Sequence, residues 1–219
     1  MTSAEDATNQ SGNPSNGQHD GPSPAPRDVH HDASQSRAGE KPRIATVSLA
    51  GCFGCHMSIL DIDERILALA EVVEFARSPI NDYKTFEGRC TVGIIEGGCC
   101  NEENVHVLED FRKHCDVLVS LGDCAINGGI PAMRNNIPLR ECLEEAYLKS
   151  PGVYNPSGTI PNDEELPLLL HRVYPCNEVV KIDHFIPGCP PHADAIFEVL
   201  SALLAGRSPA IAYADLKYD

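Results

Sequence analysis

The amino-acid sequence predicts an α/β fold in which a doubly wound parallel sheet carries helices on both faces. From Lys41 onward, short β-branched runs alternate with longer segments of helical periodicity, as expected of strands joined by crossover helices. The chain has 219 residues, enough for one such domain with its own core. The first 40 residues contain no Leu, Ile, Phe or Tyr and are rich in Ser, Asn, Gly, Pro and Asp. We therefore expect a disordered acidic tail over residues 1–40 and an α/β domain over residues 41–219.

Five strands are expected where short apolar runs end at polar or turn-forming residues, over 43–49, 72–76, 90–95, 117–121 and 179–182. Four helices are expected over 58–69, 102–114, 139–148 and 193–205. Asn101 is the expected N-cap of the second helix, and Gly206 should end the last one. Residues 149–172 form a Pro-rich insertion with little pattern. This order of elements favours a flavodoxin-like topology, which binds ligands outside the carboxyl ends of its strands.

The charge of the chain excludes several classes of partner. With 32 acidic and 17 basic residues the formal net charge is −15, whereas binding to nucleic acid or to anionic lipid normally requires a basic face. The tail carries six acids and two bases, which leaves 26 acids and 15 bases on the domain. No segment approaches the roughly 18 apolar residues of a membrane-spanning helix. We expect no nucleic-acid or membrane partner, and look to proteins and small molecules.

The ten cysteines are the main functional signal. The N-terminus shows no basic start, apolar run or twin arginine, so a cytoplasmic location is expected. Thiols stay reduced there, and many cysteines then indicate metal ligation or redox chemistry. Four of them directly follow expected strands and should converge on one edge of the sheet: Cys52, Cys55, Cys124 and Cys189.

Four thiolates at one place suit either a zinc ion or an iron–sulfur cubane. The larger group is favoured, because a zinc site would more typically show two CxxC pairs and because glycines adjoin these cysteines. The amides of Gly51, Gly54, Gly122 and Gly188 are expected to donate hydrogen bonds to cluster sulfurs. A thioredoxin-like use of the CxxC pair and a zinc-stabilised assembly module remain alternatives.

The other cysteines have different expected roles. Cys90, Cys115 and Cys142 fall in apolar elements and should pack in the core, and Cys176 should lie at the opposite edge of the sheet. Cys99 and Cys100 follow the third strand, so we place them around the site, as ligands in some redox state or as packing residues. Glu96, at the same strand end, is either a solvated carboxylate or an acid that tunes the cluster.

Several motifs resemble the small, electron-transfer subunit of [NiFe] hydrogenases: Cys52-Phe53-Gly54-Cys55, Glu96-Gly97, Gly122-Asp123-Cys124-Ala125 and Pro187-Gly188-Cys189-Pro190-Pro191. Longer phrases over 61–65, 128–135 and 173–180 are similar to the cytoplasmic NAD-reducing, bidirectional branch. The resemblance implies that Cys52, Cys55, Cys124 and Cys189 bind one proximal [4Fe–4S] cluster. One cluster is expected, since nothing after Cys189 offers further ligands.

The resemblance also implies the partners and the reaction. A large subunit would hold the Ni–Fe centre, which this chain lacks, and a diaphorase pair would carry FMN and further iron–sulfur clusters. Electrons would pass reversibly between hydrogen and NAD⁺. The iron–sulfur subunit of respiratory complex I is a similar alternative, but its motif begins with adjacent cysteines instead of the CxxC at residues 52–55. A flavin-binding carrier is a further alternative, yet FMN has little support because Gly51–Cys55 occupies the turn where phosphate would bind.

Overall fold

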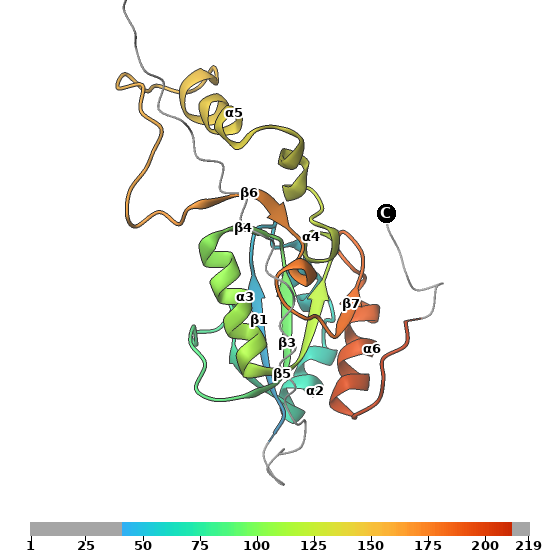
Figure 1. Ribbon diagram of the computed structural model, residues 1–219. Helices are drawn as coiled ribbons and strands as arrows, with labels where there is room; N and C mark the ends of the chain where they lie inside the picture. The colour runs from blue at the N-terminus through green and yellow to red at the C-terminus, as the bar shows by residue number, and fades with distance from the viewer. Residues whose placement is uncertain (1–40, 212–219) are drawn as a thin grey trace, which may run out of the picture.

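A five-stranded parallel sheet forms the centre of the molecule (Figure 1). The computed structural model describes residues 41–211, so the predicted tail over residues 1–40 lies outside the described part of the chain. The strands are β1 (Arg43–Ser48), β2 (Glu74–Arg77), β3 (Cys90–Glu96), β5 (Cys115–Leu121) and β7 (His184–Ile186). Their spatial order is β2-β1-β3-β5-β7, and every neighbouring pair is parallel. This is the flavodoxin-like order, and the predicted fold class is confirmed.

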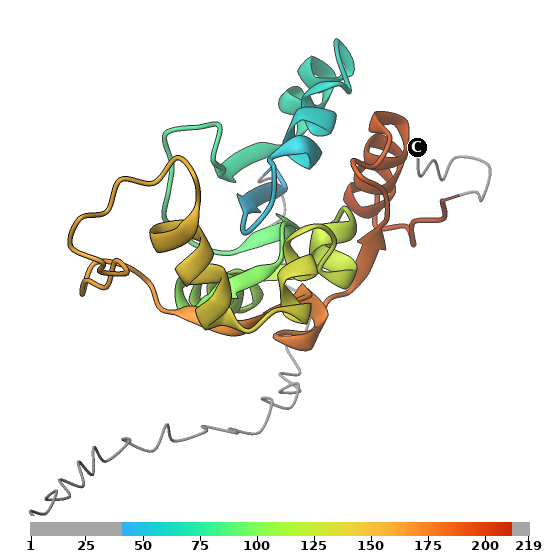
Figure 2. The same cartoon turned by 90° about the horizontal axis from the view of Figure 1, so that it is seen from above.

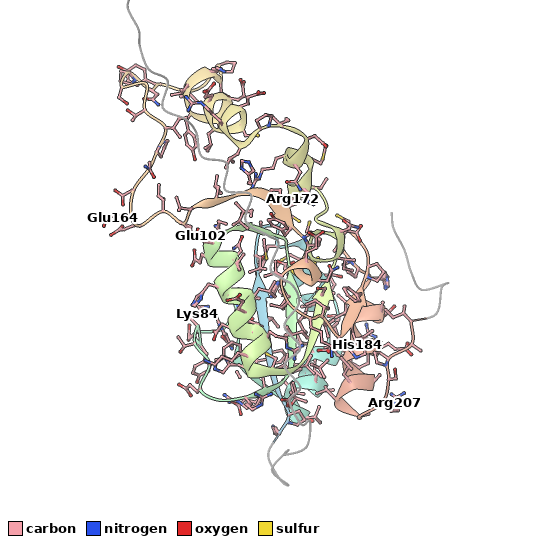
Figure 3. The ribbon with its side chains drawn as sticks, viewed as in Figure 1. Lys84, Glu102, Glu164, Arg172, His184 and Arg207 are labelled. Atoms are coloured by element: carbon pink, nitrogen blue, oxygen red, sulfur yellow. The ribbon has the colours of Figure 1, made fainter. Side chains whose placement is uncertain are left out.

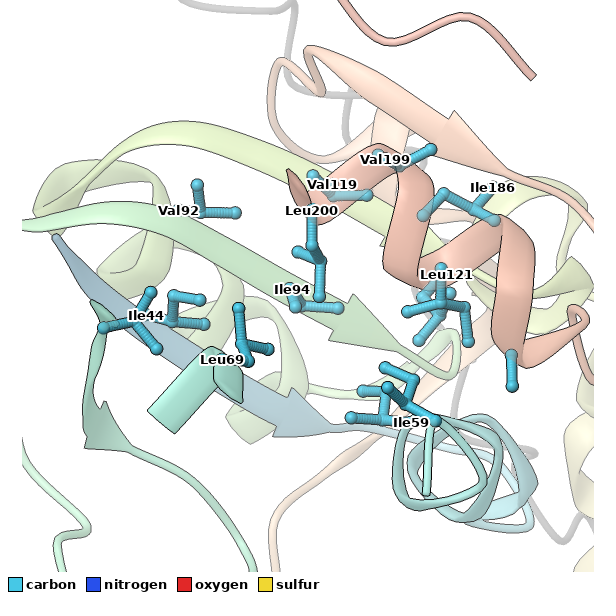
Figure 4. Packing of buried hydrophobic residues seen from close by; sticks show 14 residues of the cluster. Ile44, Ile59, Leu69, Val92, Ile94, Val119, Leu121, Ile186, Val199 and Leu200 are labelled. Atoms are coloured by element: carbon cyan, nitrogen blue, oxygen red, sulfur yellow. The ribbon is translucent and has the colours of Figure 1, made fainter. Parts of the chain in front are cut away.

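Helices cover both faces of this sheet, as predicted (Figures 1 and 2). On one face lie α1 (Gly54–Leu60), α2 (Arg65–Val72) and α6 (Ala193–Leu204), and on the other lies α3 (Glu102–His114). Ile94 packs with the first group and Ile95 with the second, because successive side chains of a strand point to opposite faces. Figure 4 shows Leu200 and Val199 of α6 packed over Val119 in the first core.

Two predicted helix ends are confirmed by their capping contacts. The Asn101 side chain accepts a hydrogen bond from the Asn104 amide at 2.8 Å, which satisfies one of the free donors at the start of α3. Gly206 follows α6 with φ +66°, and its amide donates to the Leu203 carbonyl. In residues 41–211 no helix is both long and apolar enough to cross a bilayer.

The single helix predicted over 58–69 is wrong, because the structure has two shorter helices there. Asp63 interrupts them with φ +64°, a left-handed conformation that Asp tolerates better than most residues. Ile62, at the junction, is fully buried and anchors the turn to the core. Because α2 continues to Val72, the second strand starts at Glu74, two residues later than predicted.

The predicted fifth strand over 179–182 is also wrong, because β7 begins only at His184. Val180 and Ile182 are buried, but they pack as loop residues. A short apolar run indicates burial and does not distinguish a strand from a buried loop. Asp183 marks the start of the real pairing, since its carboxylate accepts from the Leu118 amide at 2.8 Å.

A smaller layer lies over the carboxyl edge of the main sheet (Figure 1). The short strand β4 (Cys99–Asn101) pairs antiparallel with β6 (Leu169–Tyr174). The strand β6 includes the last residues of the Pro-rich insertion that was predicted over 149–172. The predicted helix over 139–148 divides into α5 (Leu139–Glu144) and the π-helical η2 (Glu145–Lys149). Side chains of the intervening loop, such as Glu164, project away from the sheet (Figure 3). The sequence did not predict β4, α4 (Asp123–Asn127), η1 (Pro131–Asn136) or η3 (Cys176–Glu178).

Candidate functional site

The structure brings Cys52, Cys55, Cys124 and Cys189 together at the carboxyl edge of the sheet. Cys52 and Cys55 lie where β1 passes into α1, Cys124 lies in α4 directly after β5, and Cys189 follows β7. The Cys55 thiol interacts electrostatically with those of Cys52 and Cys124, and the Cys124 thiol interacts with those of Cys52 and Cys189. Three strand ends thus bring four thiols to one edge of the sheet.

Four thiols at one edge of a sheet match the donor sets of both a structural zinc ion and a [4Fe–4S] cluster. Within residues 41–211, no three side chains among His, Cys, Asp and Glu are close enough together to hold one ion. A structural zinc needs its ligands around one centre, at about 2.3 Å for each sulfur. In a [4Fe–4S] cubane each thiolate binds a different iron, so the ligand sulfurs stand further apart. Four thiols from three separate strand ends supply the all-sulfur donor set that a [4Fe–4S] cluster requires.

Glycine at position 122 leaves the space that the Cys55 sulfur occupies. A β-carbon on Gly122 would lie 2.3 Å from the Cys55 sulfur, closer than any real contact. The backbone of Gly122 also has φ +81° and ψ +161°, a region that side chains do not tolerate. Both observations show a cradle that any other residue would fill.

Two of the four glycine amides that were expected to bind sulfur are engaged within the protein. The Gly122 amide donates to the Ile186 carbonyl at 2.8 Å, and the Gly188 amide donates to the Asp123 carboxylate at 3.0 Å. The Asp123 amide in turn donates to the Gly188 carbonyl at 3.0 Å. They join the loop that carries Cys124 to the loop that carries Cys189, and hydrogen bonds from these amides to cluster sulfurs remain a prediction.

Other amides do contact sulfur. The Gly54 amide donates to the Cys52 sulfur at 3.4 Å, and the Ile130 amide donates to the Cys124 sulfur. Burial raises the pKa of the Cys55 and Cys124 thiols, and the Ile130 amide offsets part of this effect at Cys124. Neutral thiols are thus favoured before assembly, and cluster binding must displace their protons.

Glu96 is buried at the end of β3. The sequence left two interpretations of this residue open, a solvated carboxylate and an acid that tunes the cluster. The side chain is 2% exposed, so the solvated alternative is wrong. Its carboxylate contacts the ring and the backbone amide of His56 and also the Cys55 thiol. Burial alone would raise the pKa of Glu96, but hydrogen bonds from His56 and Ser48 hold it below its usual value. His56 was missed by the sequence analysis, and its only signal is its place directly after the CxxC pair.

Cys176 does not lie at the opposite edge of the sheet, as the sequence predicted. Its sulfur donates to the Gly97 carbonyl at 3.3 Å and hydrogen-bonds with Cys99, and both cysteines are fully buried. The error follows from the misplaced fifth strand, because η3 sits over the carboxyl edge beside β3. Cys100 is half-buried, and its amide and sulfur both contact Asn104 Oδ1, at 3.1 and 3.3 Å.

The remaining cysteines are structural. Cys90 and Cys115 are register partners on β3 and β5, and both are buried, as predicted. Their thiols hydrogen-bond to each other, which lowers the pKa of Cys90 and raises that of Cys115. Cys142 on α5 is half-buried and lies outside both cores, contrary to the prediction. Its helix stands in the projecting layer and not against the sheet (Figure 1).

Comparison with known proteins agrees with this geometry. Residues 52–203 match the family described as "NADH ubiquinone oxidoreductase, 20 Kd subunit". The delta subunit of the NAD-reducing hydrogenase HoxS of Cupriavidus necator is 48% identical over 180 residues, which cover 82% of this chain and 86% of the relative. A subunit of the F420-non-reducing hydrogenase of Methanothermobacter marburgensis is 43% identical, over 77% of this chain and 55% of the relative. This chain therefore spans about half the length of the archaeal relative.

A solved structure shows the same fold. The NAD⁺-reducing [NiFe]-hydrogenase in the H₂-reduced state contains a chain that matches with a TM-score of 0.79 and 52% identity, covering 82% of this chain and 100% of that chain. The four thiols, the glycine cradle and the order of the parallel strands thus occur in a chain whose relatives are hydrogenase subunits. The protein belongs to the NADH ubiquinone oxidoreductase 20 kDa subunit family and stands, within it, with the small subunits of NAD-reducing and other hydrogenases.

Proposed function

We propose that this chain is the electron-transfer subunit of an NAD-reducing [NiFe] hydrogenase and holds one [4Fe–4S] cluster on Cys52, Cys55, Cys124 and Cys189. The observation that carries the proposal is the convergence of four thiols from three strand ends on one edge of the sheet, with the Cys55 sulfur in the space that Gly122 leaves. When bound, the cluster supplies one-electron transfer between the Ni–Fe centre of a large subunit and a diaphorase that reduces NAD⁺. The reaction is reversible, and bond breaking in hydrogen takes place on the partner.

The residues of this chain set the environment of the cluster. The Gly54 and Ile130 amides donate to ligand sulfurs and so stabilise thiolate charge. The buried carboxylate of Glu96, beside Cys55, opposes added electrons by its negative charge. The first effect raises the reduction potential and the second lowers it. Their combination suits a relay that works near the low potentials of hydrogen and NAD⁺.

Exposed apolar side chains next to the ligands support a large-subunit partner. Met57 and Leu60 follow Cys55 on α1 and are 44% and 41% exposed. Ile130 and Met133, which follow Cys124, are 68% and 66% exposed. Exposed apolar side chains gathered in this way are typical of an interaction site. Because Cys52 and Cys189 are also exposed in this chain, a subunit covering this edge would shield the cluster from water.

The diaphorase partner is proposed from the NAD-reducing relative. We place the complex in the cytoplasm, where the ten cysteines, all free thiols here, would stay reduced. Residues 41–211 offer no feature that favours FMN on this chain. The turn after β1, where a flavodoxin-like fold binds phosphate, holds Cys52 and Cys55 instead.

The test is to purify the complete complex anaerobically and compare the wild type with Cys124→Ser and with Cys142→Ser as the matched control. Removing one of four ligands should lower the iron content by as much as one cluster, about four iron atoms, and change the low-temperature EPR spectrum of the reduced complex. Cys142→Ser should leave both unchanged, because Cys142 stands on α5 away from the site. Zinc in place of iron, or a Cys124→Ser complex with the wild-type iron content and EPR spectrum, would overturn the proposal.

A further inference from the structure

Two buried polar side chains meet directly behind the CxxC turn. Glu96 and His56 are 2% and 1% exposed. Glu96 Oε1 lies 3.0 Å from His56 Nδ1, and Glu96 Oε2 accepts a hydrogen bond from the His56 backbone amide at 3.1 Å. A buried carboxylate is costly unless its oxygens are paired. Here one carboxylate accepts a hydrogen bond from the backbone amide of the residue that follows Cys55 and lies in close contact with its ring.

The His56 ring is held on two further sides. Its Nε2 atom lies 3.0 Å from Thr46 Oγ1 on β1, and Thr46 Oγ1 in turn lies 2.8 Å from Ser78 Oγ. The Phe53 ring stacks on the imidazole with centroids 4.6 Å apart and an interplanar angle of 6°. Phe53 has φ +68°, a left-handed conformation that is unusual for a residue with a side chain. The conformation of the turn is thus built around the His56 ring.

Glu96 connects this turn to the central strand of the sheet. It ends β3, which is hydrogen-bonded on both sides, to β1 and to β5. The same carboxylate hydrogen-bonds to the Cys55 thiol. Contacts therefore run from the central strand through one carboxylate to His56 and to Cys55, one of the four proposed ligands.

We propose that Glu96 is a positioning residue, which holds His56 and with it the turn from Cys52 to Cys55 in the conformation that receives the cluster. The inference rests on the proposed function, and it assigns Glu96 a role through its contacts with the protein. Without the carboxylate, the His56 amide and ring would lose their partner on β3. The turn would then sample other conformations, and two of the four ligands would be held less firmly.

The experiment uses the complete anaerobic complex with Glu96→Ala, Glu96→Gln and the control Asp183→Ala. Loss of an outer partner of a metal ligand weakens metal retention about 10- to 100-fold, so Glu96→Ala should release iron to a chelator at least about tenfold faster. Its EPR lines should broaden as the ligand geometry becomes heterogeneous. Glutamine keeps the shape and can hydrogen-bond to both His56 atoms, so Glu96→Gln should retain the wild-type release rate and line width.

Asp183→Ala also removes a carboxylate that accepts from a backbone amide, but at the edge of the sheet between β5 and β7. It should lower overall stability without broadening the EPR lines, which separates positioning from general destabilisation. Thr46→Val is nearly isosteric and leaves Glu96 in place, but it removes the support at His56 Nε2 together with the hydrogen bond to Ser78, so it should broaden the lines to a smaller degree. If Glu96→Ala does not assemble, Thr46→Val decides the question.

The positioning role would be overturned if Glu96→Ala showed the wild-type iron-release rate and EPR line width. If Glu96→Ala does not assemble, the same result in Thr46→Val would overturn it. Broadening in Asp183→Ala equal to that in Glu96→Ala would also overturn it. A wild-type complex without a cluster signal from this chain would instead defeat the proposed function, so the two failures are distinguishable.

Discussion

A β-carbon on Gly122 would approach the Cys55 sulfur to 2.3 Å, so the backbone after β5 touches the ligand turn after β1. This contact fixes the separation of two strand ends at the proposed cluster. We predict that Gly122→Ala destabilises the chain by about 1–3 kcal/mol through its backbone conformation alone. Because the added methyl group also displaces Cys55, the complex should lose iron, as measured by iron analysis and thermal unfolding.

Gly206→Ala is the matched control for this substitution. Gly206 also has a positive φ, +66°, but a β-carbon there would meet nothing within 4 Å. Its replacement should cost about 1–2 kcal/mol from the left-handed backbone and leave the iron content unchanged. Equal iron contents in the two variants would show that the Gly122 contact does not matter for the site.

Thiol alkylation should report which cysteines are ligands. After the chain is separated anaerobically from its partners and stripped of iron, Cys52 and Cys189 should react first, because both are exposed in this chain. In the same chain loaded with iron these two thiols should be protected, whereas the buried thiols should be unreactive in both samples. Peptide mapping by mass spectrometry checks this. Rapid alkylation of Cys52 in the iron-loaded chain would contradict the ligand assignment.

The pH dependence of alkylation should single out Cys100. Burial raises the pKa of this thiol, so it holds less thiolate at a given pH than an ordinary cysteine does. Because the thiolate is the reacting form, the alkylation rate of Cys100 should rise with pH only above the range in which a peptide thiol responds. A rate profile that coincides with that of a cysteine peptide would be inconsistent with the burial seen here.

Asp183 should be important for stability. Its carboxylate accepts from the Leu118 amide at 2.8 Å and from Arg112 Nη1 at 2.7 Å, at the point where β7 joins the sheet. Asp183→Ala leaves the amide without its partner, which should lower the free energy of unfolding by about 1–3 kcal/mol. Arg140→Ala removes the exposed ion pair with Glu144 and should change stability by less than about 0.5 kcal/mol. Denaturant unfolding of the two variants provides the comparison.

Much of this fold follows from local patterning. The runs that became β1, β3 and β5 are apolar, and Asn101 and Gly206 carry the capping chemistry that bounds α3 and α6. The cysteines after these strands could be assigned to one edge because parallel strands end together. The helix break at Asp63 and the true start of β7 could not be predicted, because burial of the surrounding residues by the rest of the fold decides both.

By itself, the sequence determined the α/β class, the edge of the sheet that carries the site and the four cysteines that gather there. These depend on periodicity and on position relative to strand ends, which are local properties. Only the tertiary structure showed that Glu96 is buried against His56, that Cys176 lies beside Gly97, and that Gly122 leaves room for the Cys55 sulfur. Each of these is a contact between residues at least 40 positions apart in the chain, which no local pattern records.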